Sequence, residues 1–244
     1  MYKRQDVDGA VHSKVIPLKD GGSLRIRGSV DRVDVLEQDG QQFVRVVDYK
    51  SGAKAFRLAD IVNGLNLQMF LYLFNVCADG SNPYAGVPAG VLYMHAARSV
   101  MTVETKRSAE KDIAGQEDKA FGMNGIVITN PDCDIPTAME HDLAGKYIPV
   151  RLKKSGVGGS LASLEQLGLL QRKIEALVAD MGNALQNGQI GQHPVQAKDH
   201  DKTCEYCDFA SVCAFKKSVT PRTYDDQTDS AVLAELEKEG ESHA

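Results

Sequence analysis

The dipeptide Asp39-Gly40 restricts the fold of this chain more than any other feature of its sequence. It separates two runs rich in β-branched residues, Leu24 to Leu36 and Phe43 to Lys50. Asp-Gly suits a two-residue type I′ turn, in which both residues have a positive φ. The pattern therefore predicts an antiparallel β-hairpin with Asp39 and Gly40 as its turn.

The register of this hairpin follows from its turn. Counting outward from Asp39-Gly40 places Asp34 opposite Arg45 and Asp31 opposite Asp48. Asp34 and Arg45 form an ordinary cross-strand pair of opposite charge, so we interpret them as structural. The parity of the apolar residues changes near Asp31, where a β-bulge would shift the pairing by one residue.

Asp31 and Asp48, if they face each other, have Cβ atoms roughly 5 Å apart. Such a pair of carboxylates is destabilising unless a cation lies between them, and Mg²⁺ commonly takes one or two carboxylates. Lys50 projects from the same strand face as Asp48, because side chains alternate along a strand. Two acids and a lysine around a metal can activate a water and offset charge on phosphorus. The alternative is that both aspartates are exposed strand-end residues with salt bridges of their own.

A helix is predicted after the hairpin, from about Arg57 to Cys77, because apolar residues recur there at helical spacing. Gln68 and Tyr72 lie one turn apart on one face of it. Tyr72 has a strong alternative interpretation as a core aromatic residue. Gln68 lies within an apolar stripe, which predicts a buried hydrogen-bond partner for its amide.

Further along the chain, the pattern predicts three strands, a helical turn and a long amphipathic helix. Ser163 and Gln166 have capping-box spacing near the start of the long helix. The expected strands are Gly90 to His95, Ile126 to Thr129 and Tyr147 to Leu152, the helical turn is Thr137 to Leu143, and the long helix is Ser160 to Asn187.

The hairpin and the first helix together resemble the PD-(D/E)XK nuclease core, in the variant shared by RecB, AddA and AddB nuclease domains. The resemblance rests on Gly28-Ser29-Val30-Asp31, Asp48-Tyr49-Lys50 and Gln68-x-x-x-Tyr72, in this order. It implies an α/β restriction-endonuclease-like fold with a central mixed sheet flanked by helices. By this resemblance, Asp31 and Asp48 correspond to the acids that bind Mg²⁺ or Mn²⁺, and Lys50 corresponds to the catalytic lysine. Gln68 and Tyr72 correspond to the glutamine and tyrosine beside the active site.

The resemblance implies a Mg-dependent deoxyribonuclease of the exonuclease kind, the nuclease domain of an AddB-type helicase–nuclease subunit in double-strand break processing and recombinational repair. The expected partners are an AddA-type subunit and the single-stranded DNA end that emerges from a helicase. The alternative is a catalytically weakened DNA-binding or clasp module. Relatives supply a further histidine or glutamate from an upstream helix, and His12 lacks a helical context. The chain has no G-x-x-x-x-G-K-[ST] phosphate loop, so we expect no ATP hydrolysis.

Three cysteines, Cys204, Cys207 and Cys213, have the spacing of a metal site. The chain has five cysteines, an odd number clustered unevenly, which argues against a disulfide framework. Spacing alone does not distinguish zinc from an iron–sulfur cluster. The candidates for a fourth ligand are Cys77, Cys133, His193 and His200.

Residues Val195 to Phe215 resemble the iron–sulfur clasp of the AddB type, with Cys204, Cys207 and Cys213 at its centre. The resemblance implies a 4Fe–4S cluster in the full-length protein. In that family the fourth cysteine lies before the nuclease core, at a position that this sequence does not contain. We therefore expect the chain to be part of a longer protein, cut just before its nuclease core. We also expect an incomplete cluster, so that protein made in air carries zinc or free thiols.

The expected domain organisation has three parts. Residues 1–190 form the nuclease core, residues 191–217 form the cysteine-rich clasp, and residues 218–244 form a polar, flexible tail.

The formal net charge of −5 means that contact with nucleic acid needs a local basic patch. Arg151, Lys153 and Lys154 form such a cluster, which either contacts a phosphate backbone or is a solvated loop. No run approaches the roughly 18 apolar residues of a membrane span, and no signal-peptide hydrophobic region follows the first residues. We expect a cytoplasmic protein that has no membrane partner.

Overall fold

The computed structural model describes residues 14–52, 55–96, 121–197, 204, 207–213 and 221–242. The chain divides into two compact units, and helix α5 (Leu164–Gln186) begins in the first and continues in the second. The first unit comprises residues 27–56 and 68–168, and the second comprises residues 14–26, 57–67 and 169–244, wherever these are described. His12 and His200 lie outside the described residues.

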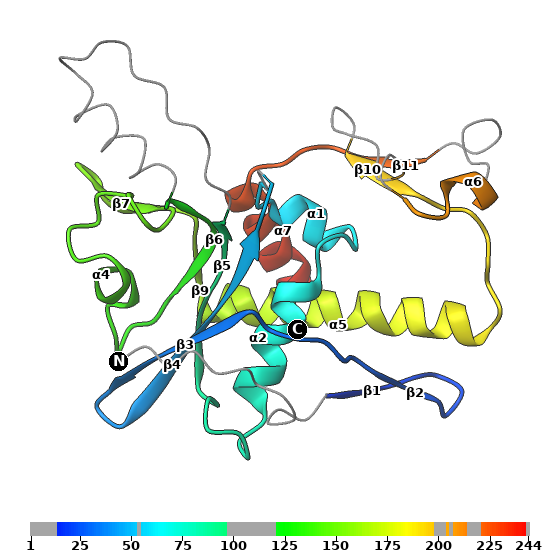
Figure 1. Ribbon diagram of the computed structural model, residues 1–244, viewed down its shortest axis with the longest axis horizontal. Coiled ribbons are helices and arrows are strands. Elements are labelled where there is room, and N and C mark those ends of the chain that lie inside the picture. The colour runs from blue at the N-terminus through cyan, green and yellow to red at the C-terminus, as the bar shows by residue number, and fades with distance from the viewer. Residues whose placement is uncertain are drawn as a thin grey trace, which may run out of the picture. The chain divides into compact units, whose positions relative to one another are not determined.

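A mixed five-stranded sheet forms the centre of the first unit, in agreement with the predicted α/β fold (Figure 1). In spatial order its strands are β3 (Arg32–Gln38), β4 (Gln41–Lys50), β5 (Val87–His95), β6 (Met123–Thr129) and β9 (Leu161–Ser163). β4 runs antiparallel to β3 and parallel to β5, while β6 runs antiparallel to β5 and parallel to β9.

The hairpin of β3 and β4 has the predicted turn. Asp39 and Gly40 have φ values of 52° and 77°, in the left-handed region that a type I′ turn requires. Asp34 is the register partner of Arg45, as counting from the turn predicts. The predicted register is therefore confirmed along the paired length of β3.

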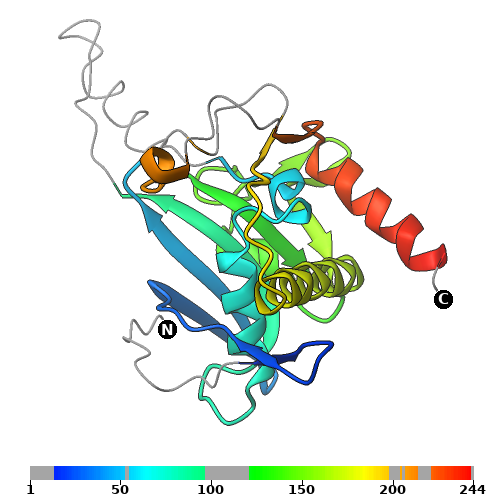
Figure 2. The same ribbon diagram turned by 90° about the vertical axis from the view of Figure 1, so that its right-hand side faces the viewer.

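Side chains of β4 alternate between the two faces of the sheet, and different elements cover each face. Val44 packs in a cluster with helix α2 (Gln68–Ala78) on one face. Phe43 packs in a larger cluster with α4 (Ile135–Met139) on the other face. Figure 2 shows α2, in cyan, crossing the strands of the sheet. Because Asp48 has the parity of Val44, it lies on the α2 face.

Two helices replace the single helix that the sequence predicts from Arg57 to Cys77. The first is α1 (Leu58–Val62), and α2 begins only at Gln68. Between them Gly64 has φ of 90° and Asn66 has φ of 55°, which no right-handed helix contains. The prediction is wrong because the apolar spacing continues through a break that these two residues impose on the backbone.

The remaining elements of the first unit agree with the sequence more closely. A second hairpin pairs β7 (Val150–Lys153) with β8 (Gly156–Gly159). The predicted capping box at the start of α5 is confirmed. Ser163 N donates to Gln166 Oε1 at 2.8 Å, and Gln166 N donates to Ser163 Oγ at 3.1 Å.

The second unit contains α7 (Asp229–Ser242) where the sequence predicts a flexible tail. Val232, Leu233 and Leu236 of α7 are buried, and Asp229 Oδ1 accepts a hydrogen bond from Leu58 N at 2.8 Å. The expectation of poor packing is therefore wrong for this helix. Its apolar stripe is short and its other positions are polar, so its periodicity is weak in sequence.

The second unit also contains four short strands and a one-turn helix, and it shares α5 with the first unit. These are β1 (Val15–Pro17), β2 (Ser23–Arg25), β10 (Val195–Ala197), β11 (Arg222–Tyr224) and α6 (Ala210–Cys213). Within the described ranges of the chain, no helix is long and apolar enough to cross a membrane.

Candidate active site

Asp48 and Lys50 lie at the end of β4, on the face of the sheet that α2 covers. Asp48 is buried, with 7 % of its surface exposed. Lys50 Nζ lies 2.5 Å from Asp48 Oδ2, and the two groups form an ion pair. No donor among the described residues is aligned to hydrogen-bond Asp48 Oδ2, so the charge of Lys50 alone balances this buried oxygen.

An aromatic wall lies beside this ion pair. Tyr93 of β5 is the register partner of Asp48, and Lys50 Nζ lies 5.7 Å from the centroid of the Tyr93 ring. The Phe56 ring centroid lies 6.3 Å from that of Tyr93 and 6.2 Å from that of Phe70. Lys50 therefore interacts with both a carboxylate and an aromatic face, which restrict where its ammonium lies.

Asp31 does not pair with Asp48 across the ladder, as the sequence predicts, because the pairing of β3 begins only at Arg32. Its Oδ2 atom instead accepts a hydrogen bond from Tyr49 N at 3.0 Å. In a continued ladder this N–H would bond a carbonyl of the partner strand. The exposed Asp31 carboxylate replaces that carbonyl, and so it lies against the peptide that joins Asp48 to Tyr49.

Gln68 and Tyr72 contact each other on α2. Gln68 Nε2 donates to Tyr72 Oη at 3.0 Å, but Gln68 is exposed, so the buried partner predicted for it is not the one found. The Tyr72 ring lies directly on the backbone of Gly28, where a Cβ atom would be only 2.7 Å from Tyr72 Cζ. This close approach links α2 to the segment that leads into Asp31.

Two further residues of this region have no role in the sequence analysis. They are Tyr93 and His95, which is the register partner of Lys50 and lies on the same sheet face. Both placements depend on a register shift between Val44 and Arg45 in the β4–β5 pairing. No local pattern in the sequence signals that shift, and the pairing joins strands that are distant in the chain.

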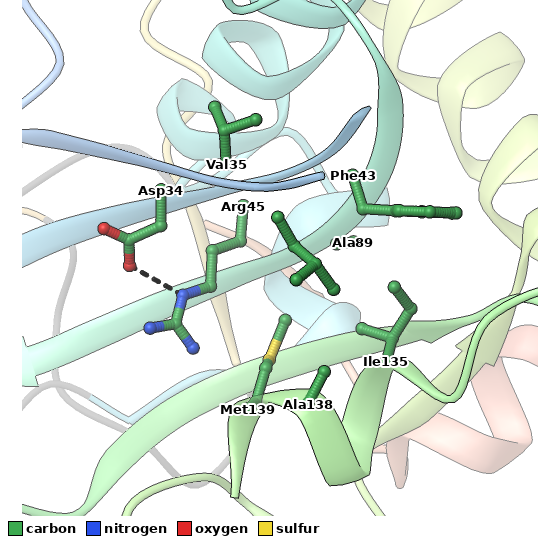
Figure 3. A pocket seen from close by; sticks show the side chains of 9 residues that line it. Asp34, Val35, Phe43, Arg45, Ala89, Ile135, Ala138 and Met139 are labelled. Carbon is green, nitrogen blue, oxygen red and sulfur yellow. Dashed lines mark hydrogen bonds and ion pairs between the residues drawn. The ribbon is translucent and has the colours of Figure 1, made fainter. Parts of the chain in front are cut away.

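The opposite face of the hairpin carries the buried ion pair of Asp34 and Arg45 (Figure 3). Arg45 Nε and Arg32 Nε each donate to Asp34, both at 2.7 Å. Burial opposes the charge on Arg32, but hydrogen bonds to Asp34 and Tyr49 outweigh it and raise the pKa of Arg32. Figure 3 shows Asp34 and Arg45 pointing to the side of Met139, where they border a cavity of about 110 Å³. The geometry agrees with the structural role predicted for Asp34.

The carboxylates of Asp31 and Asp48 offer oxygen ligands for the divalent metal that the resemblance implies. Mg²⁺ commonly takes one or two carboxylates and completes its shell with water and phosphate. Asp48 Oδ2 is buried and has no hydrogen-bond donor, so it retains capacity to accept a cation. This donor set fits such a metal. Within the part of the chain that the structure describes, no three His, Cys, Asp or Glu side chains gather as a metal site.

The cysteines do not form a metal site among the described residues. Cys204, Cys207 and Cys213 are free thiols that do not gather around one point. Burial raises the pKa of Cys77 to about 12 and also raises the pKa of Cys133. A metal ligand must be a thiolate, so neither is favoured as a fourth ligand.

Comparison with known proteins places this geometry in a family. The family model described as the PD-(D/E)XK nuclease superfamily matches residues 3–214. The B-type subunit of the ATP-dependent helicase/deoxyribonuclease of Ruminiclostridium cellulolyticum is 32 % identical over 216 residues, which are 86 % of this chain and 18 % of that protein. The protein of the same name from Bacillus cereus is 31 % identical over 244 residues, 95 % of this chain and 20 % of that protein. The one from Listeria welshimeri is 29 % identical over 242 residues, 95 % of this chain and 21 % of that protein.

The chain therefore spans about a fifth of the length of these relatives. The family match extends across the hairpin, α2 and the whole five-stranded sheet. It agrees with a mixed sheet in which an aspartate and a lysine, two residues apart, end a buried strand. The chain belongs to the PD-(D/E)XK nuclease superfamily.

Proposed function

We propose that this chain is a Mg²⁺- or Mn²⁺-dependent deoxyribonuclease domain that hydrolyses phosphodiester bonds at the end of β4. The observation that carries the proposal is the buried Asp48 carboxylate in contact with the Lys50 ammonium, beside the peptide that the Asp31 carboxylate contacts. A buried acid, an exposed acid and a lysine at one strand end match the needs of metal-assisted phosphate chemistry.

In this proposal Asp31 and Asp48 hold the divalent ion. When bound, such an ion supplies an activated water and offsets charge on the phosphate oxygens. Tyr49 N–H fixes the orientation of Asp31 through the 3.0 Å hydrogen bond, so this carboxylate is held before a metal arrives. Asp48 is held by its burial and by the Lys50 ammonium.

Lys50 is the proposed catalytic lysine. Its ammonium offsets the negative charge that develops on phosphorus as the phosphodiester bond breaks. The contacts with Asp48 and the Tyr93 ring limit its movement, so little reorganisation is needed during the reaction. Gln68 and Tyr72 are exposed or partly exposed polar groups on α2, and we assign them to positioning of the DNA strand.

The wider assignments rest on the names of the relatives. We propose that the domain acts as an exonuclease on the single-stranded DNA end that emerges from a helicase, in a complex with an AddA-type subunit. The relatives are named as the B-type subunit of an ATP-dependent helicase/deoxyribonuclease, which supports a role in double-strand break processing. We also keep Cys204, Cys207 and Cys213 as proposed ligands of a 4Fe–4S cluster in the full-length protein.

The test is cleavage of labelled linear DNA with and without Mg²⁺, by wild type and by Lys50→Ala. We expect cleavage by wild type only with the metal, and a loss of at least about 100-fold in turnover for Lys50→Ala. DNA affinity should be unchanged, because the lysine is assigned to the transition state. Lys173→Ala, which removes a surface lysine paired with Glu239, is the matched control. Cleavage by Lys50→Ala at the wild-type rate would rule out this role.

A further inference from the structure

The β7–β8 hairpin presents cations on one face only. Arg151 and Lys153 of β7 are exposed, and their register partners on β8 are Gly158 and Gly156. Partners across a hairpin share a face, so two long cationic side chains lie opposite two residues that have no side chain. This cation face, Arg151 and Lys153 with the facing glycines, leaves room for another chain to approach the backbone closely.

The stems of these two cations are supported by glycines. A Cβ atom at Gly158 would lie 3.4 Å from Lys153 Cδ, Cε and Nζ, so the whole stem lies across this glycine. A Cβ atom at Gly145 would lie 3.0 Å from Arg151 Nε. Lys154 adds a third exposed cation in the two-residue turn. The side chains therefore lie along the hairpin surface, which reduces the entropy lost when they bind an anion.

The other face of the hairpin has a different character. Leu152 and Val157 are partners across the strands, and they are exposed by 64 % and 46 %. The segment 146–159 contains four cations and no acidic residue, in a chain whose formal net charge is −5. Within the described part of the chain, no ion pair involves Arg151, Lys153 or Lys154. The cation face thus complements a polyanion, and the apolar face does not.

The segment that leads into this hairpin lies at the same end of the sheet as Asp48 and Lys50. Lys50 is the partner of His95, and the preceding residue of β5, Met94, is the partner of Met123 on β6. Met123 N in turn donates to Tyr147 O at 2.9 Å. Three strand spacings of nearly 5 Å separate β4 from Tyr147, so the two lie about 15 Å apart across the sheet. A strand of nucleic acid only a few nucleotides long spans this distance.

We propose that the cation face of the β7–β8 hairpin binds the sugar–phosphate backbone of the DNA strand, on one side of the cleavage site. This inference rests on the proposed nuclease function, and it assigns the substrate contact to a surface that lies outside the Asp31, Asp48 and Lys50 cluster. The contact is to phosphates, so it carries no sequence preference and depends on salt concentration.

The test measures binding of a labelled single-stranded oligonucleotide by fluorescence anisotropy over a series of salt concentrations. All variants carry Lys50→Ala, and metal is removed with EDTA, so that no cleavage occurs. Arg151→Gln combined with Lys153→Gln should lower the slope of log affinity against log salt by about 1.4, since each lost phosphate contact contributes about 0.7. This slope corresponds to an affinity about 25-fold lower at roughly 0.1 M salt.

The matched control is the apolar face of the same hairpin. Leu152→Thr combined with Val157→Thr should leave both the slope and the affinity unchanged. An unchanged slope for the cation-face variant would overturn the inference and leave the nuclease function standing, whereas an absence of DNA binding by the parent protein would overturn both. Loss of binding to a partner subunit with normal DNA binding would also overturn it, because the hairpin would then be a protein-docking surface.

Discussion

Replacing Asp34 with alanine is expected to lower the free energy of unfolding by about 3–5 kcal/mol. Asp34 accepts hydrogen bonds from Arg45 Nε and Arg32 Nε, both at 2.7 Å. The side chains of Asp34 and Arg45 are only 6 % and 9 % exposed, so water cannot replace the missing carboxylate. The variant would leave the Arg45 guanidinium buried without its counter-charge.

The size of this effect separates the three charges. The Arg32 side chain is 26 % exposed, so Arg32→Ala should cost only about 1 kcal/mol, as for a partly solvated pair. Asp34→Val combined with Arg45→Leu should be more stable than Asp34→Ala, because no uncompensated charge remains. The cavity of about 110 Å³ beside the pair gives the new side chains space to adjust.

Urea unfolding followed by circular dichroism measures these free energies, and the chain has no tryptophan to follow by fluorescence. The variants should keep the m-value of wild type if only the native state is affected. A loss below about 1 kcal/mol for Asp34→Ala would refute the argument that a buried ion pair fixes the hairpin. A double variant that is less stable than Asp34→Ala would refute it as well.

Three other variants test separate parts of the structure. Gly28→Ala should cost about 1–3 kcal/mol, because its methyl group meets the Tyr72 ring, and Tyr72→Ala should relieve that cost in a double-mutant cycle measured by urea unfolding. Burial raises the pKa of Glu140, but backbone N–H donors outweigh it and hold this pKa below 4.5, so the stability it contributes is present above that pH and lost as pH falls through the lowered pKa. Glu140→Gln should therefore cost about 2 kcal/mol at neutral pH and show a flatter loss of stability in acid, and equal acid sensitivity would contradict this. Cys204→Ser should lower the metal content of anaerobically prepared full-length protein by elemental analysis, whereas Cys77→Ser should not, since burial disfavours the Cys77 thiolate.

The hairpin was predictable from sequence because its constraints are local. Asp39 and Gly40 specify a turn type, and a two-residue turn fixes the register of every pair along β3. That register places Asp34 against Arg45 without any knowledge of the rest of the fold. The same counting fails at Asp31, where a side chain takes the place of the backbone in the ladder.

The features that the sequence did not predict depend on distant parts of the chain or on single residues. Tyr93 reaches Asp48 through a parallel pairing whose register shifts at a bulge, which no periodicity records. The break between α1 and α2 depends on the positive φ of Gly64, inside a run that keeps helical spacing. The packing of α7 depends on three buried side chains in a polar segment, and only tertiary structure shows their partners.

The central claim is that Asp31 and Asp48 together hold one divalent ion at the end of β4. Calorimetric titration of Mg²⁺ or Mn²⁺ into wild type, Asp31→Asn, Asp48→Asn and Asp39→Asn tests it most directly. Asp39→Asn removes a carboxylate from the same hairpin, and asparagine suits the positive φ of that turn position, so it is the matched control. We predict one binding event in wild type and in Asp39→Asn, and a loss of at least about tenfold in affinity for each of the other two variants. Wild-type affinity in Asp31→Asn or Asp48→Asn, or an equal loss in Asp39→Asn, would contradict the claim.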